Sequence, residues 1–97
     1  MRTQPRQIVV CYDICDPKRL RAVYRLMRSF GDHLQYSVFL CELSPNQKVR
    51  LVTSLEQVIK PTEDQVLFLD LGFQDPERRI EALGVPWVYP ERTVRIF

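Results

Sequence analysis

The sequence predicts an α+β fold, a ferredoxin-like plait (βαββαβ) with an extra C-terminal strand, in a single domain spanning residues 1–97. Three apolar segments rich in β-branched residues predict strands at 8–14, 35–43 and 65–71. The two segments between them carry apolar residues at helical spacing, which predicts two amphipathic helices. Two helices on one face of an antiparallel sheet form a plait of this kind.

Both helices have recognisable start and stop signals. Asp16, followed by proline, is an N-cap carboxylate with proline at the first helical position. Gly31 is expected to take the left-handed conformation that ends this first helix. Ser44 and Gln47 match a capping box at the start of the second helix, and Pro61 is expected to end it.

The C-terminal quarter predicts only short elements. Asp75, again followed by proline, predicts a short helix that ends at Gly84. Residues 87–89 and 93–97 are candidates for terminal strands. The expected order along the chain is therefore strand, helix, strand, helix, strand, short helix and strand, with a fifth strand at the end.

The composition is that of an ordinary globular protein, with 45% hydrophobic residues, 27% charged residues and a net charge of +2. No segment approaches the ~20 apolar residues of a membrane span, and the start lacks the apolar stretch of a signal peptide. Cys11, Cys15 and Cys41 have neither zinc-ligand spacing nor the pattern of a disulfide framework. A reducing cytoplasmic location, with no membrane contact, is the expectation.

Asp13 is the first candidate for chemistry, because it ends the first strand just before a helix. Carboxylate oxygens are the ligands that Mg²⁺ and Mn²⁺ prefer. One carboxylate per chain is too few for a site, but two copies related by a dyad could share one ion that activates water. The alternative is that Asp13 only bonds backbone amides at the strand end. Asp16 lies nearby, but its position favours N-cap duty.

The first predicted helix is strongly basic, with no acidic residue between positions 18 and 28. Four of its basic residues are three or four positions apart and share a face that could follow a row of phosphates, whereas Arg19 lies to one side. A solvated surface is the alternative. The residues of this candidate nucleic-acid surface are Lys18, Arg19, Arg21, Arg25 and Arg28, and four later residues could extend it: Arg78, Arg79, Arg92 and Arg95.

Several residues near Asp13 are expected to support the site or an interface. Tyr12 points away from Asp13 and is expected to be buried. Ser37 and Phe39 share one face of the second predicted strand, and Phe39 should pack in the core or at an interface. His33 is expected in a loop, with a general base as the alternative. Tyr36 falls on the opposite face from Phe39, which argues against an RNA-recognition motif with paired aromatics.

Taken in order, the strings VVCYDICDPKRLRAVYRLMRSFG and QYSVFLCEL resemble the CRISPR-associated protein two family. The similarity is strong over residues 8–43, looser through 64–71 and weak after Gly72. One departure is the stretch before the second strand, where relatives carry a basic residue and this chain has His33. The matching features are Tyr12-Asp13-Ile14, Asp16, Lys18-Arg19, Gly31 and Gln35-x-Ser37-Val38-Phe39.

This resemblance implies a symmetric homodimer in which residues 92–97 of one subunit join the sheet of the other. It implies that Asp13 of both subunits faces the dyad and binds Mg²⁺ or Mn²⁺. The implied activity is that of a metal-dependent phosphodiesterase, an endonuclease on RNA or double-stranded DNA in antiviral defence. The implied partner is the CRISPR-associated integrase subunit, and the basic residues Lys18, Arg19 and Arg21 would contact phosphates.

Two other functions remain open. The dimer could be a noncatalytic scaffold that holds duplex DNA between integrase dimers, in which case Asp13 would matter little. The chain could also be a toxin ribonuclease of the virulence-associated protein D type, which shares the plait and the strand-end aspartate. The basic helix and the QYSVF segment favour the CRISPR assignment over the toxin.

Overall fold

The predicted α+β plait is confirmed by a computed structural model, which describes residues 4–73 and 80–86. The four strands form one antiparallel sheet in the order β2-β3-β1-β4. The elements are β1 (Arg6–Asp13), α1 (Pro17–Arg28), β2 (Gly31–Gln35), β3 (Val38–Leu43), α2 (Pro45–Glu56) and β4 (Gln65–Gly72).

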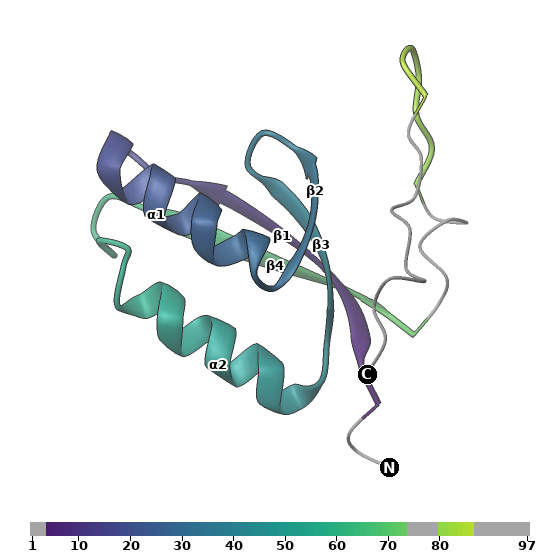
Figure 1. Cartoon of the computed structure of the whole chain (residues 1–97), viewed down its shortest axis with the longest axis horizontal. Helices are drawn as coiled ribbons and strands as arrows, with labels where there is room; N and C mark the ends of the chain where they lie inside the picture. Colours follow the sequence, from purple (N-terminus) through teal and green to yellow (C-terminus); the bar gives the residue numbers. More distant parts are fainter. Residues whose placement is uncertain (1–3, 74–79, 87–97) are drawn as a thin grey trace.

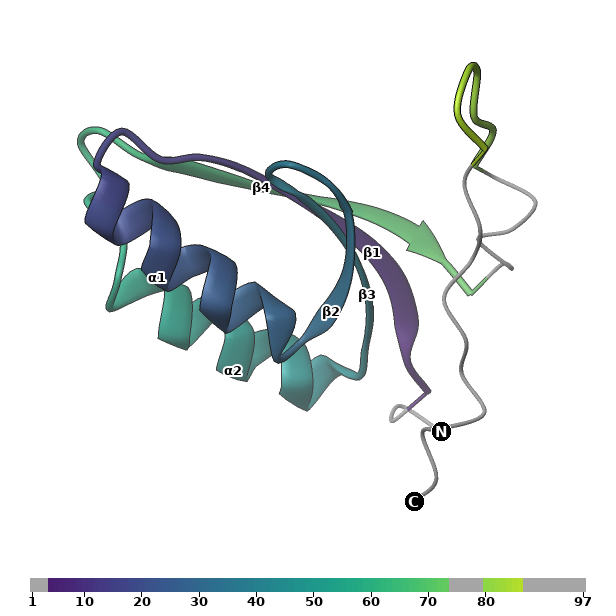
Figure 2. The same ribbon diagram turned by 45° about the horizontal axis from the view of Figure 1, so that its top comes forward.

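The two helices lie side by side against one face of the sheet (Figures 1 and 2). The hydrophobic core lies between this face of the sheet, which we call the helix face, and the two helices. It includes Phe39, Val23, Met27, Leu51 and Leu55. No helix of the described ranges covers the other face, which we call the open face. Over the described ranges the fold therefore has two layers, one of helices and one of strands.

Strand β1 runs through the middle of the sheet and divides its side chains between the two faces. Ile8, Val10 and Tyr12 are buried in the core on the helix face. The alternation of a strand places Cys11 and Asp13 on the open face. Asp13 is thus at the end of a central strand and on the side that the helices leave free.

The predicted helix starts are confirmed. The Asp16 carboxylate accepts a hydrogen bond from the Arg19 backbone N–H at 3.0 Å, as an N-cap does. Ser44 and Gln47 form the capping box: the Gln47 N–H donates to Ser44 Oγ at 3.2 Å, and the Ser44 N–H donates to Gln47 Oε1 at 2.8 Å.

Helix α2 ends at Glu56, earlier than the proline at position 61 led us to expect. The chain from Lys60 to Asp64 instead forms its own turn, in which the Asp64 N–H donates to the Lys60 carbonyl at 2.8 Å. The Asp64 carboxylate also accepts the Lys60 N–H at 2.8 Å. This local pairing satisfies backbone groups that a longer helix would have used.

The predicted strand at 35–43 is in fact half of a hairpin. Strand β2 precedes it, and Tyr36 and Ser37 form the turn into β3. Tyr36 has φ of +21°, a value that side-chain-bearing residues rarely adopt. Because the turn contains no glycine, proline or asparagine, the sequence pattern concealed it.

The expectation for Gly31 is wrong. Ser29 caps α1, and Gly31 is outside the left-handed region and opens β2 opposite Cys41. A Cβ at Gly31 would lie 2.7 Å from the Leu40 carbonyl oxygen and would collide with Cys41 Sγ. Glycine is therefore needed here for the close approach of two strands rather than for its backbone freedom.

The short helix expected from Asp75 to Gly84 is wrong over the residues that the structure describes, because 80–86 contain no helix. Residues 81–86 are exposed, so an isolated turn of helix would have had no core to stabilise it. The other C-terminal predictions fall outside the described residues. They are the rest of the short helix (75–79), the terminal strand candidates 87–89 and 93–97, and the exchanged segment 92–97. The same holds for four basic residues, Arg78, Arg79, Arg92 and Arg95.

Two further expectations concern the cysteines, which showed no pattern of a disulfide framework, and the lack of an apolar segment long enough to span a membrane. The three cysteines are free thiols: Cys15 is exposed, Cys11 is partly buried and Cys41 is buried. Burial raises the pKa of the Cys41 thiol to about 12, with a smaller contribution from the negative charge of Asp32. Within residues 4–73 and 80–86, every helix is too short or too polar to cross a bilayer.

Candidate nucleic-acid and metal site

The carboxylate of Asp13 is exposed at the end of β1 on the open face. It forms no hydrogen bond or ion pair with any described residue. The alternative that this carboxylate only bonds backbone amides at the strand end is therefore not what the structure shows. An uncommitted carboxylate at this position is available to a ligand.

The tip of the β2–β3 hairpin lies beside Asp13. The Tyr12 N–H donates to the Ser37 carbonyl at 3.0 Å, which continues the β1–β3 pairing beyond Cys11 and Val38. Tyr36 lies at the tip of the hairpin, at the end of the sheet where β1 ends with Asp13. The side chain of Tyr36 is 92% exposed. On the other side of β1, Asp13 pairs with Gln65 of β4.

Buried aromatic residues support this end of the sheet from the helix side. Tyr12 and Phe39 stack with ring centroids 6.2 Å apart: Tyr12 is buried as predicted, and Phe39 takes the core position, one of the two positions predicted for it. Burial raises the pKa of Tyr12, the nearby Tyr24 adds to this, and a hydrogen bond with the Ser37 side chain opposes it. Ser37 thus contacts Tyr12 through both its backbone and its side chain.

His33 is in β2 rather than in a loop. Its Nε2 is 2.7 Å from the Tyr36 carbonyl oxygen, and since a carbonyl only accepts, Nε2 is the donor. Its ring contacts Tyr24 edge-on at 5.3 Å and Phe39 at 4.9 Å. These contacts commit the ring to holding the hairpin, which leaves the general-base alternative without support.

The basic residues of α1 divide into two groups. The exposed group is the basic row, which consists of Lys18, Arg21, Arg25 and Arg28. Arg21 and Arg25 form no salt bridge with any residue in the described ranges. Arg28 donates to the Tyr24 hydroxyl at 3.2 Å and remains exposed. These cations are free to meet phosphate groups.

Arg19 is the exception, because its guanidinium binds acidic residues of the α2–β4 connection. Its Nε donates to Asp64 Oδ2 at 2.8 Å, and its Nη2 donates to Glu63 Oε1 at 3.1 Å. The sequence already placed Arg19 to one side of the basic row. Its main contact is thus within the protein, although it was predicted to bind nucleic acid.

Asp64 is the important residue that sequence reasoning missed. Its side chain is completely buried and accepts hydrogen bonds from Arg19, from the Cys15 N–H at 2.9 Å and from the Lys60 N–H at 2.8 Å. The hydrogen bond from Arg19 is the main reason that the pKa of Asp64 is well below its usual range. Nothing in the sequence around Asp64 marks it as buried, because its donors are distant or are backbone groups.

A divalent ion would find only part of a site in one chain. Among residues 4–73 and 80–86, no group of three or more His, Cys, Asp or Glu residues is placed to hold a metal. Asp13 offers one carboxylate with free oxygens, and the nearby Asp16 and Asp64 are engaged in backbone hydrogen bonds. Among the described residues, one chain therefore offers a divalent ion a single free carboxylate, that of Asp13.

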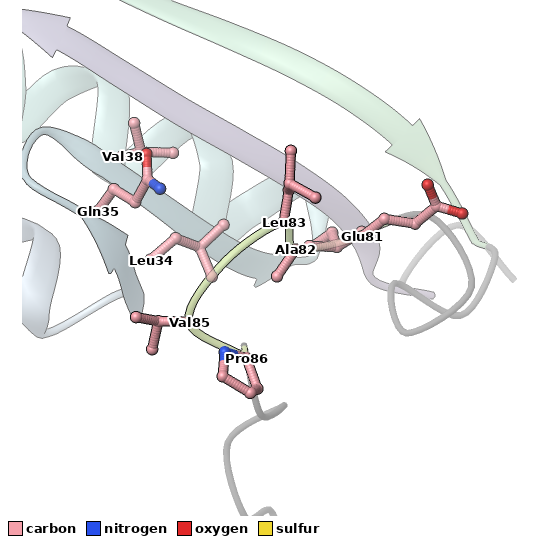
Figure 3. Close-up of a pocket in the computed structure, with 9 residues that line it drawn as sticks. Leu34, Gln35, Val38, Glu81, Ala82, Leu83, Val85 and Pro86 are labelled. Atoms are coloured by element: carbon pink, nitrogen blue, oxygen red, sulfur yellow. The ribbon is translucent and has the colours of Figure 1, made fainter.

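A hollow of about 480 Å³ lies on the open face between the β2–β3 hairpin and the segment 80–86 (Figure 3). Leu34 and Val38 line it from the strands, and Leu83 and Val85 line it from the segment. None of its described lining residues is basic, and Glu81 is acidic. Its chemistry does not suit phosphate, so the basic row remains the candidate nucleic-acid surface.

The fold and this site define a class: a small ferredoxin-like protein with a strand-end carboxylate and a basic first helix. The family model of CRISPR associated protein Cas2 matches residues 6–79. The chain belongs to this family. The resemblance drawn from residues 8–43 is confirmed, and the match favours it over a toxin of the virulence-associated protein D type.

Individual relatives agree with the family match. The chain is 40% identical over 89 residues to CRISPR-associated endoribonuclease Cas2 1 of Rhodospirillum rubrum, covering 91% of this chain and 87% of that protein. It is 38% identical over 77 residues to CRISPR-associated endoribonuclease Cas2 of Geobacter sulfurreducens, covering 78% and 81%. The crystal structure of Streptococcus pyogenes Cas2 at pH 6.5 superposes with a TM-score of 0.74 at 36% identity, covering 80% and 99%.

Proposed function

We propose that this protein is a CRISPR-associated endoribonuclease in which Asp13 is the catalytic carboxylate. The observation that carries the proposal is that Asp13 is exposed at the end of β1 and has no partner in the described part of the chain. A carboxylate that only stabilised the strand end would be bonded there. The curated relatives bear the name endoribonuclease, which supports the same activity for this chain.

The basic row on α1 binds the phosphate backbone of the substrate. Helix α1 begins four residues after Asp13, so the row starts at the same end of the sheet as the carboxylate. Lys18, Arg21 and Arg25 are exposed and can meet successive phosphates. Each cation that contacts a phosphate releases a counterion, which makes the binding dependent on salt.

A second copy of the chain completes the site across the open face. Leu67 and Leu69 of β4 are 50% and 48% exposed on this face, beside the partly buried Cys11 of β1. Exposed leucines on the uncovered side of a sheet are typical of an interface between subunits. A two-fold axis through this face brings a second Asp13 toward the first.

The two copies of Asp13 would together hold Mg²⁺ or Mn²⁺, which are the ions that carboxylate oxygens suit. When bound, such an ion neutralises phosphate charge and lowers the pKa of a coordinated water. Asp13 would hold the ion through its carboxylate oxygens, and the basic row would position the phosphodiester. The reaction adds water across one P–O bond and leaves a phosphate monoester and a free hydroxyl.

A noncatalytic scaffold is the second candidate function. It is favoured by one observation: a single chain lacks a metal-ligand cluster among its described residues. In that function the basic row would hold duplex DNA between two dimers of a CRISPR-associated integrase subunit, and Asp13 would have no chemical part. Integration assays with that subunit and the Asp13→Ala variant test it, because a scaffold keeps its activity.

The decisive experiment is a nuclease assay on single-stranded RNA and duplex DNA with Mg²⁺, Mn²⁺ or EDTA. Wild type is compared with Asp13→Asn, and Glu56→Gln, an exposed carboxylate at the end of α2, is the matched control. We expect metal-dependent RNA cleavage that falls at least about 100-fold in Asp13→Asn and is unchanged in Glu56→Gln. Cleavage that survives in a folded Asp13→Asn variant would overturn the assignment.

A further inference from the structure

Tyr36 is an aromatic residue with no evident structural use. Its side chain is 92% exposed, and neither its ring nor its hydroxyl has a partner among the described residues. Its backbone has φ of +21°, where a residue with a Cβ is strained and glycine would not be. A tyrosine at this position therefore costs stability and gains no packing in the protein alone.

The strained turn is held in place from the core. The His33 Nε2 donates to the Tyr36 carbonyl at 2.7 Å. The His33 ring is in turn packed against Phe39, which is completely buried, and against Tyr24 of α1. This chain of contacts fixes the backbone that presents Tyr36. An aromatic ring on a fixed backbone loses less conformational entropy when it binds a ligand.

The tip of the hairpin occupies a specific place relative to the proposed site. The hydrogen bond from the Tyr12 N–H to the Ser37 carbonyl brings the hairpin tip, and with it Tyr36, to the end of the sheet where Asp13 lies. The basic row begins at Lys18, at the same end of the sheet. A strand of nucleic acid that follows the row toward Asp13 thus reaches the end of the sheet where Tyr36 is exposed.

We propose that Tyr36 stacks on an unpaired nucleobase of the RNA strand whose backbone is presented to Asp13. This inference rests on the proposed function and names its substrate as single-stranded RNA. Every base has a π-face that an aromatic ring can cover, so the contact tolerates any sequence. Bases inside a duplex are already stacked and paired, so Tyr36 favours single strands over duplexes.

Binding can be measured apart from cleavage in an Asp13→Asn background, with a short RNA that carries 2-aminopurine. Stacking is worth ~1–3 kcal/mol per base, so Tyr36→Ala should weaken single-strand binding about 5- to 150-fold. Tyr36→Phe keeps the ring and should stay within about twofold of the parent. Duplex binding should change less than about twofold, and quenching of 2-aminopurine should be lost only in Tyr36→Ala.

Tyr36→Gly is a second variant that guards against misfolding, because glycine accepts the positive φ without strain. It should be at least as stable as the parent and should lose single-strand binding as Tyr36→Ala does. Single-strand binding that is unchanged in both variants would overturn the inference. Equal losses in Tyr36→Phe and Tyr36→Ala would also overturn it, since the hydroxyl would then be the contact. A change of oligomeric state in Tyr36→Ala would mean that the residue contacts protein.

This test is separate from that of the proposed function. If Asp13 has no catalytic role, the stacking signal in the Asp13→Asn background persists. In the active protein, Tyr36→Ala should raise KM for RNA about 5- to 150-fold and leave kcat within about threefold. A fall in kcat without a rise in KM would contradict stacking as the contribution of Tyr36.

Discussion

The buried carboxylate of Asp64 binds the guanidinium of Arg19, with Arg19 Nε 2.8 Å from Asp64 Oδ2. The same carboxylate accepts the N–H of Cys15, two residues after Asp13. One side chain thereby joins the start of α1, the loop that follows β1 and the loop that precedes β4. This junction fixes the chain two residues beyond Asp13, and within the described chain Asp64 makes no hydrogen bond to Asp13 itself.

The stability of the protein should fall in acid because of Asp64. Its pKa is lowered in the folded protein, whereas an unfolded chain binds the proton near the ordinary value of 3.8. The stabilisation is therefore complete above about pH 4 and is lost as the pH falls toward the folded pKa. Urea unfolding at pH 7, 5, 3 and 2 should show this loss in the wild type.

Asp64→Asn is the comparison for that measurement, because it keeps the shape and removes the charge. The variant should be less stable at pH 7, and its stability should depend less on pH below 4, so the two curves converge. Parallel curves would show that Asp64 does not titrate differently in the folded and unfolded chains. Asp70→Asn, at an exposed pair with Arg6, is the control and should change the pH dependence less.

The salt dependence of nucleic-acid binding should distinguish the role of the basic row from that of Arg19. The double variant Arg21→Ala/Arg25→Ala removes two exposed cations and should lower the slope of log Kd against log salt by about 1.4 for a single strand. Arg19→Ala should leave the slope unchanged and lower the melting temperature instead, because it leaves Asp64 buried without its cation. Arg50→Ala, an exposed cation on α2, is the control for nonspecific charge. Filter-binding titrations at several salt concentrations measure the slopes.

A charge on the open face should separate the proposed dimer. Leu69→Glu places a carboxylate on β4 among exposed apolar side chains, and burying it at an interface would be strongly unfavourable. Light scattering should show twice the chain mass of 11.5 kDa for the wild type and a single chain for Leu69→Glu. Val49→Glu, at a 63% exposed position on α2, should remain dimeric. If wild type is monomeric at micromolar concentration, the shared site is disproved.

Gly31→Ala tests the close approach of β2 and β3. The new Cβ would meet the Leu40 carbonyl oxygen at 2.7 Å, and backbone there cannot move without disturbing the sheet. We expect a loss of about 1–3 kcal/mol in the free energy of unfolding, measured in urea. Adding Cys41→Ala removes the collision with Sγ and should recover only part of the loss, because the carbonyl remains. Full recovery would mean that the thiol alone is the obstacle.

Local signals in the sequence were sufficient for most elements of the plait. The caps at Asp16 and Ser44 depend on residues three positions apart, and such short-range hydrogen bonds can be predicted from the chain itself. The hairpin was missed because a tyrosine occupies its strained turn. That conformation is maintained by His33 and the aromatic core, which are tertiary contacts.

The sequence by itself determined both helices, the strands β1, β3 and β4, the strand-end position of Asp13 and the exposed basic row, because alternation and helical periodicity are properties of neighbouring residues. Only the tertiary structure decided which cations of α1 pair with acidic residues of the described chain. Arg19 and Asp64 are 45 positions apart, and the folded sheet is what brings their charges within 2.8 Å. The same holds for the hairpin tip that carries Tyr36, because the register of β1 against β3 brings this tip to the same end of the sheet as Asp13.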